Sequence, residues 1–163
     1  MAGTFSGHGD LRELLSTNTS CLNESDEEPH QNVFRDDGSC LASDADEQIL
    51  LSLKFTKAVK MSAIVINAPA GETLPRTVKI FANPGVMGFE DAEDAKPTHV
   101  ISLTEENLGK EITLPFVRFQ FIASLAIFVE DNHGDDITKL SGLSFIGAPC
   151  AEMNMAEFKR QGG

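Results

Sequence analysis

The sequence contains no tryptophan and no tyrosine, and its eleven phenylalanines supply all of its aromatic content. Trp and Tyr are favoured where proteins stack on sugars or anchor interfaces, so their absence argues against carbohydrate recognition. No apolar run approaches the roughly 20 residues of a membrane-spanning helix. Residues 1–8 also lack the cationic and apolar stretches of a signal peptide. We therefore expect a soluble intracellular protein, cytoplasmic with the nucleus as a second location.

Positive charge is scarce, since 13 Lys and Arg face 25 Asp and Glu and give a formal net charge of −12. Nucleic acids and anionic membranes are bound through clustered cations, so neither is an expected partner. Nine of the acids lie between Glu24 and Glu47, where Arg35 is the only Lys or Arg, and four more lie between Glu130 and Asp136. This composition predicts surface loops, and a partner that is neutral or basic.

The three cysteines, Cys21, Cys40 and Cys150, are widely separated and include no Cys-x-x-Cys pair. We predict free, mostly buried thiols without a redox role. Acids crowd Cys21 and should suppress its thiolate, which favours a structural role over a reactive one. Asn18 and Asn23 each begin a glycosylation sequon, which we interpret as a chance match.

No catalytic motif is present, because Gly3–Gly7 only resembles a nucleophile elbow and no phosphate-binding glycine loop occurs. The acids of 44–47 and 130–136 could hold a hard cation such as calcium, but neither segment fits the EF-hand register. The histidines show no zinc-site spacing. We therefore predict no enzyme, no metal and no cofactor. The alternative function is a ligand-binding jelly roll for a saccharide or a calcium-supported small molecule.

Alternation with a period of two predicts two strands over 49–55 and 59–66, joined by a hairpin at Thr56–Ala58. Further strands are predicted over 78–82, 99–103, 111–114, 116–122, 124–130 and 139–146. Helical signal between strands is confined to 104–108, so a parallel sheet lacks its crossover helices. Capping-box patterns predict short terminal helices from Asp10 and from Asn154. The prediction is an all-β, antiparallel jelly-roll β-sandwich over residues 10–160, between flexible ends at 1–9 and 161–163.

Several segments, spread from about Leu14 to Arg160, together resemble the PITH domain, the proteasome-interacting module found at the carboxyl end of thioredoxin-like proteins. They include Cys21-Leu22-Asn23-Glu24-Ser25-Asp26, Ser43-Asp44-Ala45-Asp46-Glu47-Gln48, Val78-Lys79-Ile80-Phe81, Phe89-Glu90-Asp91-Ala92-Glu93, Ser124-Leu125-Ala126-Ile127-Phe128-Val129, Phe145-Ile146-Gly147 and Phe158-Lys159-Arg160. The resemblance implies a galactose-binding-like jelly roll that docks to the proteasome regulatory particle, alone or as the partner of a thioredoxin-like protein. It supplies no catalytic residue, and this chain contains no thioredoxin active-site motif.

Our candidate contact surface, the acidic loop pair, consists of Glu24, Asp26, Glu27 and Glu28 in one loop and Asp44, Asp46 and Glu47 in the other. Adjoining carboxylates create a field that attracts and orients a basic partner. The alternative is that Ser43 and Asp44 only cap the entrance to the next strand, while the other acids solvate the surface. We expect the chain to be a monomer.

Overall fold

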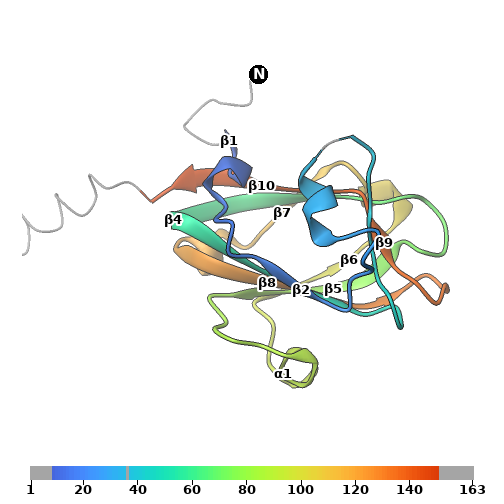
Figure 1. The fold of residues 1–163 in the computed structure, drawn as a ribbon. Coiled ribbons are helices and arrows are strands. Elements are labelled where there is room, and N and C mark those ends of the chain that lie inside the picture. Colours follow the sequence, from blue (N-terminus) through green and yellow to red (C-terminus); the bar gives the residue numbers. More distant parts are fainter. Residues whose placement is uncertain (1–8, 36, 151–163) are drawn as a thin grey trace, which may run out of the picture.

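The computed structural model describes residues 9–35 and 37–150. Its strands form a curled antiparallel sheet that folds into two facing layers, a jelly-roll β-sandwich (Figure 1). The predicted fold class is thereby confirmed. The strands are β1 (Gly9–Asp10), β2 (Ser20–Leu22), β3 (Leu41–Ala42), β4 (Ile49–Asn67), β5 (Pro75–Ala82), β6 (His99–Ser102), β7 (Glu111–Thr113), β8 (Ile122–Asn132), β9 (Lys139–Leu140) and β10 (Gly142–Pro149).

The described helices are short: η2 (Arg12–Leu14), η3 (His30–Phe34), α1 (Phe89–Asp94), η4 (Glu105–Asn107) and η5 (Phe116–Phe119). No helix in the described part of the chain is both long and apolar enough to cross a membrane. The fold therefore rests on its strands.

The long strand β4 belongs to both layers of the sandwich. Its residues 49–54 pair with β2 and β8, and β8 continues to β5 and β6. Its residues 59–67 pair with β10 and β7, and β1 lies beyond β10. The strands β3 and β9 form a separate antiparallel pair.

The predicted hairpin at Thr56–Ala58 is wrong, because β4 is one continuous strand of 19 residues. A short hairpin turn needs residues that accept a positive φ, and Thr-Lys-Ala contains neither Gly nor Asn. The segment instead stays extended and is hydrogen-bonded like a strand, since the Cys150 N–H donates to Ala58 O at 2.8 Å. The register against β8 shifts between Lys54 and Val59, which is where β4 passes from one layer to the other.

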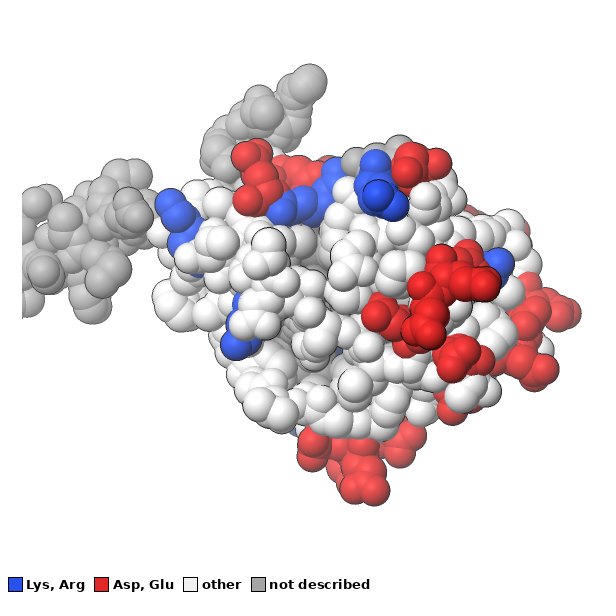
Figure 2. Space-filling view, viewed as in Figure 1, with Lys and Arg blue, Asp and Glu red and all other residues white. Residues whose placement is uncertain are grey.

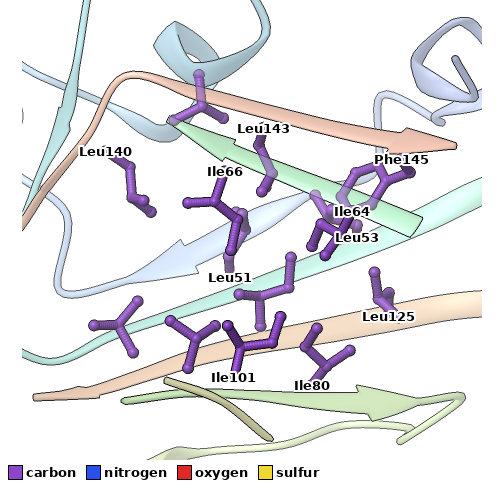
Figure 3. Close-up of a cluster of buried hydrophobic side chains, with 14 of the residues drawn as sticks. Leu51, Leu53, Ile64, Ile66, Ile80, Ile101, Leu125, Leu140, Leu143 and Phe145 are labelled. Carbon is purple, nitrogen blue, oxygen red and sulfur yellow. The ribbon is translucent and has the colours of Figure 1, made fainter. Parts of the chain in front are cut away.

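Aliphatic side chains from both layers fill the space between them (Figure 3). The labelled ones are Leu51, Leu53, Ile64, Ile66, Ile80, Ile101, Leu125, Leu140, Leu143 and Phe145. Phe55 and Phe145 meet edge to face across the core, with 6.1 Å between ring centroids. The alternating pattern of 49–55 thus marked the buried face of β4 correctly. The pattern of 59–66 did so only as far as Met61, because the register against β10 shifts beyond it, so that Ile64 and Ile66 enter the core and Val65 is half-buried.

The outer face of β4 and β8 carries a second apolar cluster. Leu50, Ala126 and Phe128 are buried there, with Ala92 of α1 in the same cluster and Phe89 packed against it. The central part of β8 is therefore buried on both faces, as its nearly continuous apolar run predicted. The helix α1 was not predicted, because its six residues, FEDAED, offer only one turn and a half of apolar pattern.

Two other predicted strands differ from the structure. Residues 116–119 form the turn η5, and β8 starts only at Ile122, since Phe119 is the only buried residue of the turn and Phe116, Val117 and Phe121 are exposed. The strand predicted over 139–146 is divided at Ser141, so that β9 pairs with β3 and β10 pairs with β4. The strands predicted over 78–82, 99–103, 111–114 and 124–130 are confirmed, as is the turn over 104–108.

The ends and the first acidic segment also need correction. The segment 24–47 is not a plain surface loop, because it contains η3 and β3 and buries His30 and Val33. The helix predicted from Asp10 is the single turn η2. Gly9, expected in the flexible end, pairs with Gly147. Residues 1–8 and 161–163 and the helix predicted from residue 154 lie outside the described residues.

Candidate functional site

The two loops of the acidic loop pair lie side by side, and Asn23 joins them. Its Nδ2 donates to Gln48 O at 2.7 Å and to Asp46 Oδ1 at 2.9 Å, and its Oδ1 accepts the Ala45 N–H at 3.0 Å. Its backbone oxygen accepts the Asp44 N–H at 2.9 Å. Asn23 has a φ of 70°, a left-handed conformation that asparagine tolerates better than most residues. The loops therefore form one hydrogen-bonded unit.

A buried polar network supports the second loop from below. The fully buried Thr138 donates from Oγ1 to Glu47 O at 2.7 Å and from its N–H to Ser43 Oγ at 2.9 Å. Asn132 Nδ2 donates to Thr138 Oγ1 at 3.0 Å. A buried polar group left without a partner costs about 1–3 kcal/mol, so this network holds the loop in one position. The Ser43 side chain thus bonds across to Thr138 rather than capping β4.

The structure separates the seven predicted acids by what their side chains contact. Asp26, Glu27 and Asp44 are exposed, and Glu47 is half-buried. None of these four carboxylates forms an ion pair or accepts a hydrogen bond within the described residues. By contrast, Asp46 Oδ1 also accepts the Gln48 N–H at 3.0 Å, and Glu28 Oε1 lies 4.0 Å from Lys139 Nζ. Asp46 is therefore held by Asn23 and is not a free surface charge. We call the hydrogen bonds that Asn23 makes with residues 44–46 and 48 the clamp.

Glu24 has a structural role as well, which the prediction missed. Its Oε1 accepts the backbone N–H of His30 at 2.7 Å and lies 2.8 Å from His30 Nδ1. His30 Nε2 lies 2.9 Å from Thr19 Oγ1, so hydroxyl, imidazole and carboxylate follow the order of a catalytic triad. Yet His30 is 3% exposed, so a substrate in solution could not reach its imidazole. The trio anchors the first loop instead.

The second acidic segment, 130–136, is largely engaged with neighbouring cations. Asp131 Oδ2 accepts from Arg76 Nη2 at 2.9 Å, and this contact lowers the pKa of Asp131. Glu130 Oε2 accepts from Lys79 Nζ at 3.3 Å. Across residues 9–35 and 37–150, no group of three or more His, Cys, Asp or Glu could hold a metal ion. The acidic loops thus form no ready cation cage there.

The cysteines are free thiols, and each is half-buried rather than mostly buried. Burial, with a smaller contribution from the Glu24 carboxylate, raises the pKa of Cys21 to about 12. The pKa values of Cys40 and Cys150 are also raised, chiefly by burial. Since the thiolate is the nucleophile, these environments disfavour thiol chemistry and support the structural role predicted for Cys21.

The acidic surface extends beyond the predicted loops. Gln48 Nε2 donates to Glu93 Oε2 at 3.2 Å, which links the second loop to α1. Figure 2 shows acidic side chains gathered on the right of the molecule and at its lower edge, where α1 lies, with few cations among them. The sequence could not reveal this continuity, because 45 residues separate the two side chains.

Comparison with protein families identifies the chain. The model of the PITH domain matches residues 4–162, nearly the whole sequence. This chain belongs to the PITH domain family. The resemblance inferred from its sequence motifs is therefore confirmed.

Several curated PITH relatives are similar to this chain. Thioredoxin-like protein 1 of Schizosaccharomyces pombe is 35% identical over 148 residues, which cover 86% of this chain and 51% of the relative. PITH domain-containing protein CG6153 of Drosophila melanogaster is 34% identical, with 76% and 61% covered. Human PITH domain-containing protein 1 is 32% identical, with 74% and 60% covered. This PITH chain thus spans about half to two thirds of the length of these relatives.

Solved structures confirm the fold of this PITH domain. A family 32 carbohydrate-binding module from Clostridium perfringens NanJ, in complex with galactose, has a TM-score of 0.66 at 16% identity and covers 85% of this chain and 98% of its own. Modules of ZmpB from the same organism, in complex with GalNAc, have a TM-score of 0.65 at 11% identity, with 83% and 35% covered. At such identities the likeness shows a galactose-binding-like jelly roll and no shared ligand.

Proposed function

We propose that this PITH domain is a non-catalytic docking module that binds the proteasome regulatory particle through its acidic loop pair. The observation that carries the proposal is the clamp at Asn23, which fixes both loops while Asp26, Glu27 and Asp44 stay exposed and unpaired within the described residues. A surface that is already ordered loses less conformational entropy on binding.

The charge of the loops indicates what kind of surface they would meet. Unpaired carboxylates that adjoin one another attract a basic patch and set its orientation, and they act more on the association rate than on the final affinity. The family resemblance supplies the expected partner, the regulatory particle, and a location in cytoplasm and nucleus. A thioredoxin-like protein that carries a domain of this type would be brought to the same partner.

Binding of the purified chain to purified regulatory particle tests the proposal, with the proteolytic core particle as the control. We expect saturable binding to the regulatory particle alone. We also expect the association rate to fall as salt rises from about 50 to 300 mM, because exposed charges are screened over that range. Absence of binding to the regulatory particle would refute the proposed partner.

Matched variants test the acidic loop pair itself. The triple variant Asp26→Asn, Glu27→Gln, Asp44→Asn removes three exposed charges and leaves the clamp untouched. The control Glu13→Gln, Glu106→Gln, Glu111→Gln removes three exposed charges outside the two loops. The first should slow association about tenfold or more, and the control should have a much smaller effect. Equal effects would show that only net charge matters and that the loops are not the contact.

A further inference from the structure

Exposed apolar side chains of the described residues concentrate at one corner of the sandwich. Phe116, Val117 and Phe121 on and beside η5 are 43%, 81% and 63% exposed, and Val86 in the neighbouring loop is 104% exposed. We call these four residues the η5 corner. Contiguous exposed apolar surface on a soluble domain is characteristic of an interaction site, whereas single exposed side chains are not.

The η5 corner is held in place by hydrogen bonds and is not a frayed turn. Asn83, with a φ of 52°, donates from Nδ2 to Phe121 O at 2.8 Å and accepts the N–H groups of Ala123 and Ser124 at 2.8 and 3.2 Å. The same asparagine begins the loop that carries Val86. The turn and the loop are therefore fixed relative to each other, and their apolar side chains are displayed by an ordered backbone.

The charged side chains beside η5 itself are positive, although the chain as a whole carries −12. On the Val86 side of the corner, Asp91 of α1 accepts the Gly88 N–H at 2.9 Å. Arg118 projects from η5 and donates from Nη1 to Thr98 O at 3.0 Å, beside the half-buried His99. Cys150 donates from Sγ to Gln120 O at 3.3 Å and lies close enough to Lys60 to interact with its charge. No carboxylate of the described residues lies within ion-pair distance of either Arg118 or Lys60.

The η5 corner is also far from the acidic loop pair. The strand β8 starts beside η5, where Ile122 pairs with Val59, and its far part lies opposite Ile49, which follows the second acidic loop. The seven residue steps from Ile122 to Val129 span roughly 23 Å, so one molecule could engage both surfaces at once. The acidic loop pair favours a basic partner and the η5 corner favours an acidic one. A single partner surface with charge of one sign could therefore not bind both.

We propose that the η5 corner is a second docking surface, which binds an acidic amphipathic segment of a partner protein. Apolar side chains of that segment pack on Val117 and Phe121, and its carboxylates face Arg118 and Lys60. Charge complementarity selects this occupant, because cations with no carboxylate partner border the apolar surface. The inference is independent of the function proposed for the acidic loops, since the two surfaces lie at opposite ends of β8.

A defined peptide tests the proposal on the full chain. The probe is a labelled peptide of about 14 residues with leucine at helix positions i, i+3, i+4 and i+7 and glutamate elsewhere, and its control has lysine in place of every glutamate. We expect the acidic peptide to shift the backbone amide resonances of residues 84–87 and 116–121 in heteronuclear NMR spectra. The lysine peptide should leave these resonances in place.

Matched substitutions separate the corner from the rest of the surface. Val117→Ser and Phe121→Ser should each weaken the acidic peptide about tenfold, which is the effect of losing one well-packed apolar side chain. The control Leu22→Ser removes an exposed apolar side chain outside the corner and should change nothing. Arg118→Gln should weaken the binding of the acidic peptide and reduce the dependence of that binding on salt. The control Arg35→Gln, at an exposed arginine away from the corner, should do neither.

Four results would overturn the proposal. The first is amide shifts that map away from residues 84–87 and 116–121, and the second is equal binding of the lysine peptide. The third is binding of the acidic peptide only after residues 151–163 are removed, because the corner would then belong to the chain's own end. Binding of phosphatidylserine vesicles at the corner without binding of the peptide would likewise replace a protein partner by a membrane.

Discussion

Replacing Asn23 by alanine should lower the free energy of unfolding by about 2.5–4 kcal/mol, an unusually large effect for a half-buried polar residue. Three side-chain hydrogen bonds of 2.7, 2.9 and 3.0 Å are lost. Each contributes about 0.5–1.5 kcal/mol net, and the lower half of that range applies because water can replace partly exposed bonds. Alanine at a φ of 70° adds about 1 kcal/mol of backbone strain.

Asn23→Gly separates the two contributions. Glycine loses the same hydrogen bonds but accepts a positive φ without strain, so it should cost about 1 kcal/mol less than alanine. Asn18→Ala is the matched control, because Asn18 is an exposed asparagine that lies outside the two acidic loops.

Urea denaturation followed by circular dichroism measures these differences, and thermal melting should show Asn23→Ala about 5–10 °C below the wild type. The reasoning fails if Asn23→Ala is no less stable than Asn18→Ala. A glycine variant that is less stable than the alanine variant would show that the positive φ of residue 23 does not strain an alanine there.

Three further predictions concern other parts of the domain. Gly147→Ala should cost about 3 kcal/mol or more, because a Cβ would overlap the backbone oxygen of Lys60; a melting temperature within about 2 °C of wild type would contradict this. Cys21 should react with iodoacetamide at neutral pH at least 100-fold more slowly than free cysteine, roughly as its raised pKa requires, and site-resolved mass spectrometry would expose any faster reaction. The pKa of Asp131 is lowered mainly by its hydrogen bond from Arg76, so the pair's stabilisation is present above the ordinary carboxyl pKa and is lost as pH falls through the lowered value. Asp131→Asn should therefore make the free energy of unfolding less dependent on pH below about pH 4. An unchanged pH dependence would count against a stabilising role of the pair.

Local pattern predicted most of the strands because their burial repeats within a few residues. The alternation around Val78 and Ile80 and the apolar run from Leu125 to Val129 each report which faces of a strand are covered. The same pattern located the core face of β4 over 49–55, but beyond Met61 it placed Ile64 and Ile66 on the wrong face. Since the sandwich is built from such strands, its fold class followed from the sequence.

The errors arise where distant contacts decide the backbone. Nothing near Thr56–Ala58 indicates that Cys150 will bond to its carbonyl oxygen and keep the chain extended. Likewise the apolar run at 116–121 has the composition of a strand, but Phe119 alone of these residues enters the core, while Asn83 holds the end of the turn. Periodicity cannot distinguish a buried strand from an apolar turn that presents its side chains to solvent.

For the candidate site, composition located the acids but not their roles. Counting charges treats Glu24, Asp44 and Asp46 alike, whereas the structure uses Glu24 to hold His30 and Asp46 to hold Asn23. Only Asp44 among the three keeps an exposed carboxylate without a partner in the described residues. The one local signal of the clamp is an asparagine directly after a strand, a position where this residue often adopts a left-handed conformation.

The placement of charge bears on how many molecules this domain could bring together. Acidic loops at one end of β8 and a cation-bordered apolar corner at the other would, on shape alone, allow copies to join head to tail. The net charge of −12 opposes such chains, because each added copy brings further like charge at close range. A basic partner at the loops and an acidic partner at the corner both reduce that repulsion locally. We therefore expect a monomer that connects two different proteins rather than a chain that assembles with itself.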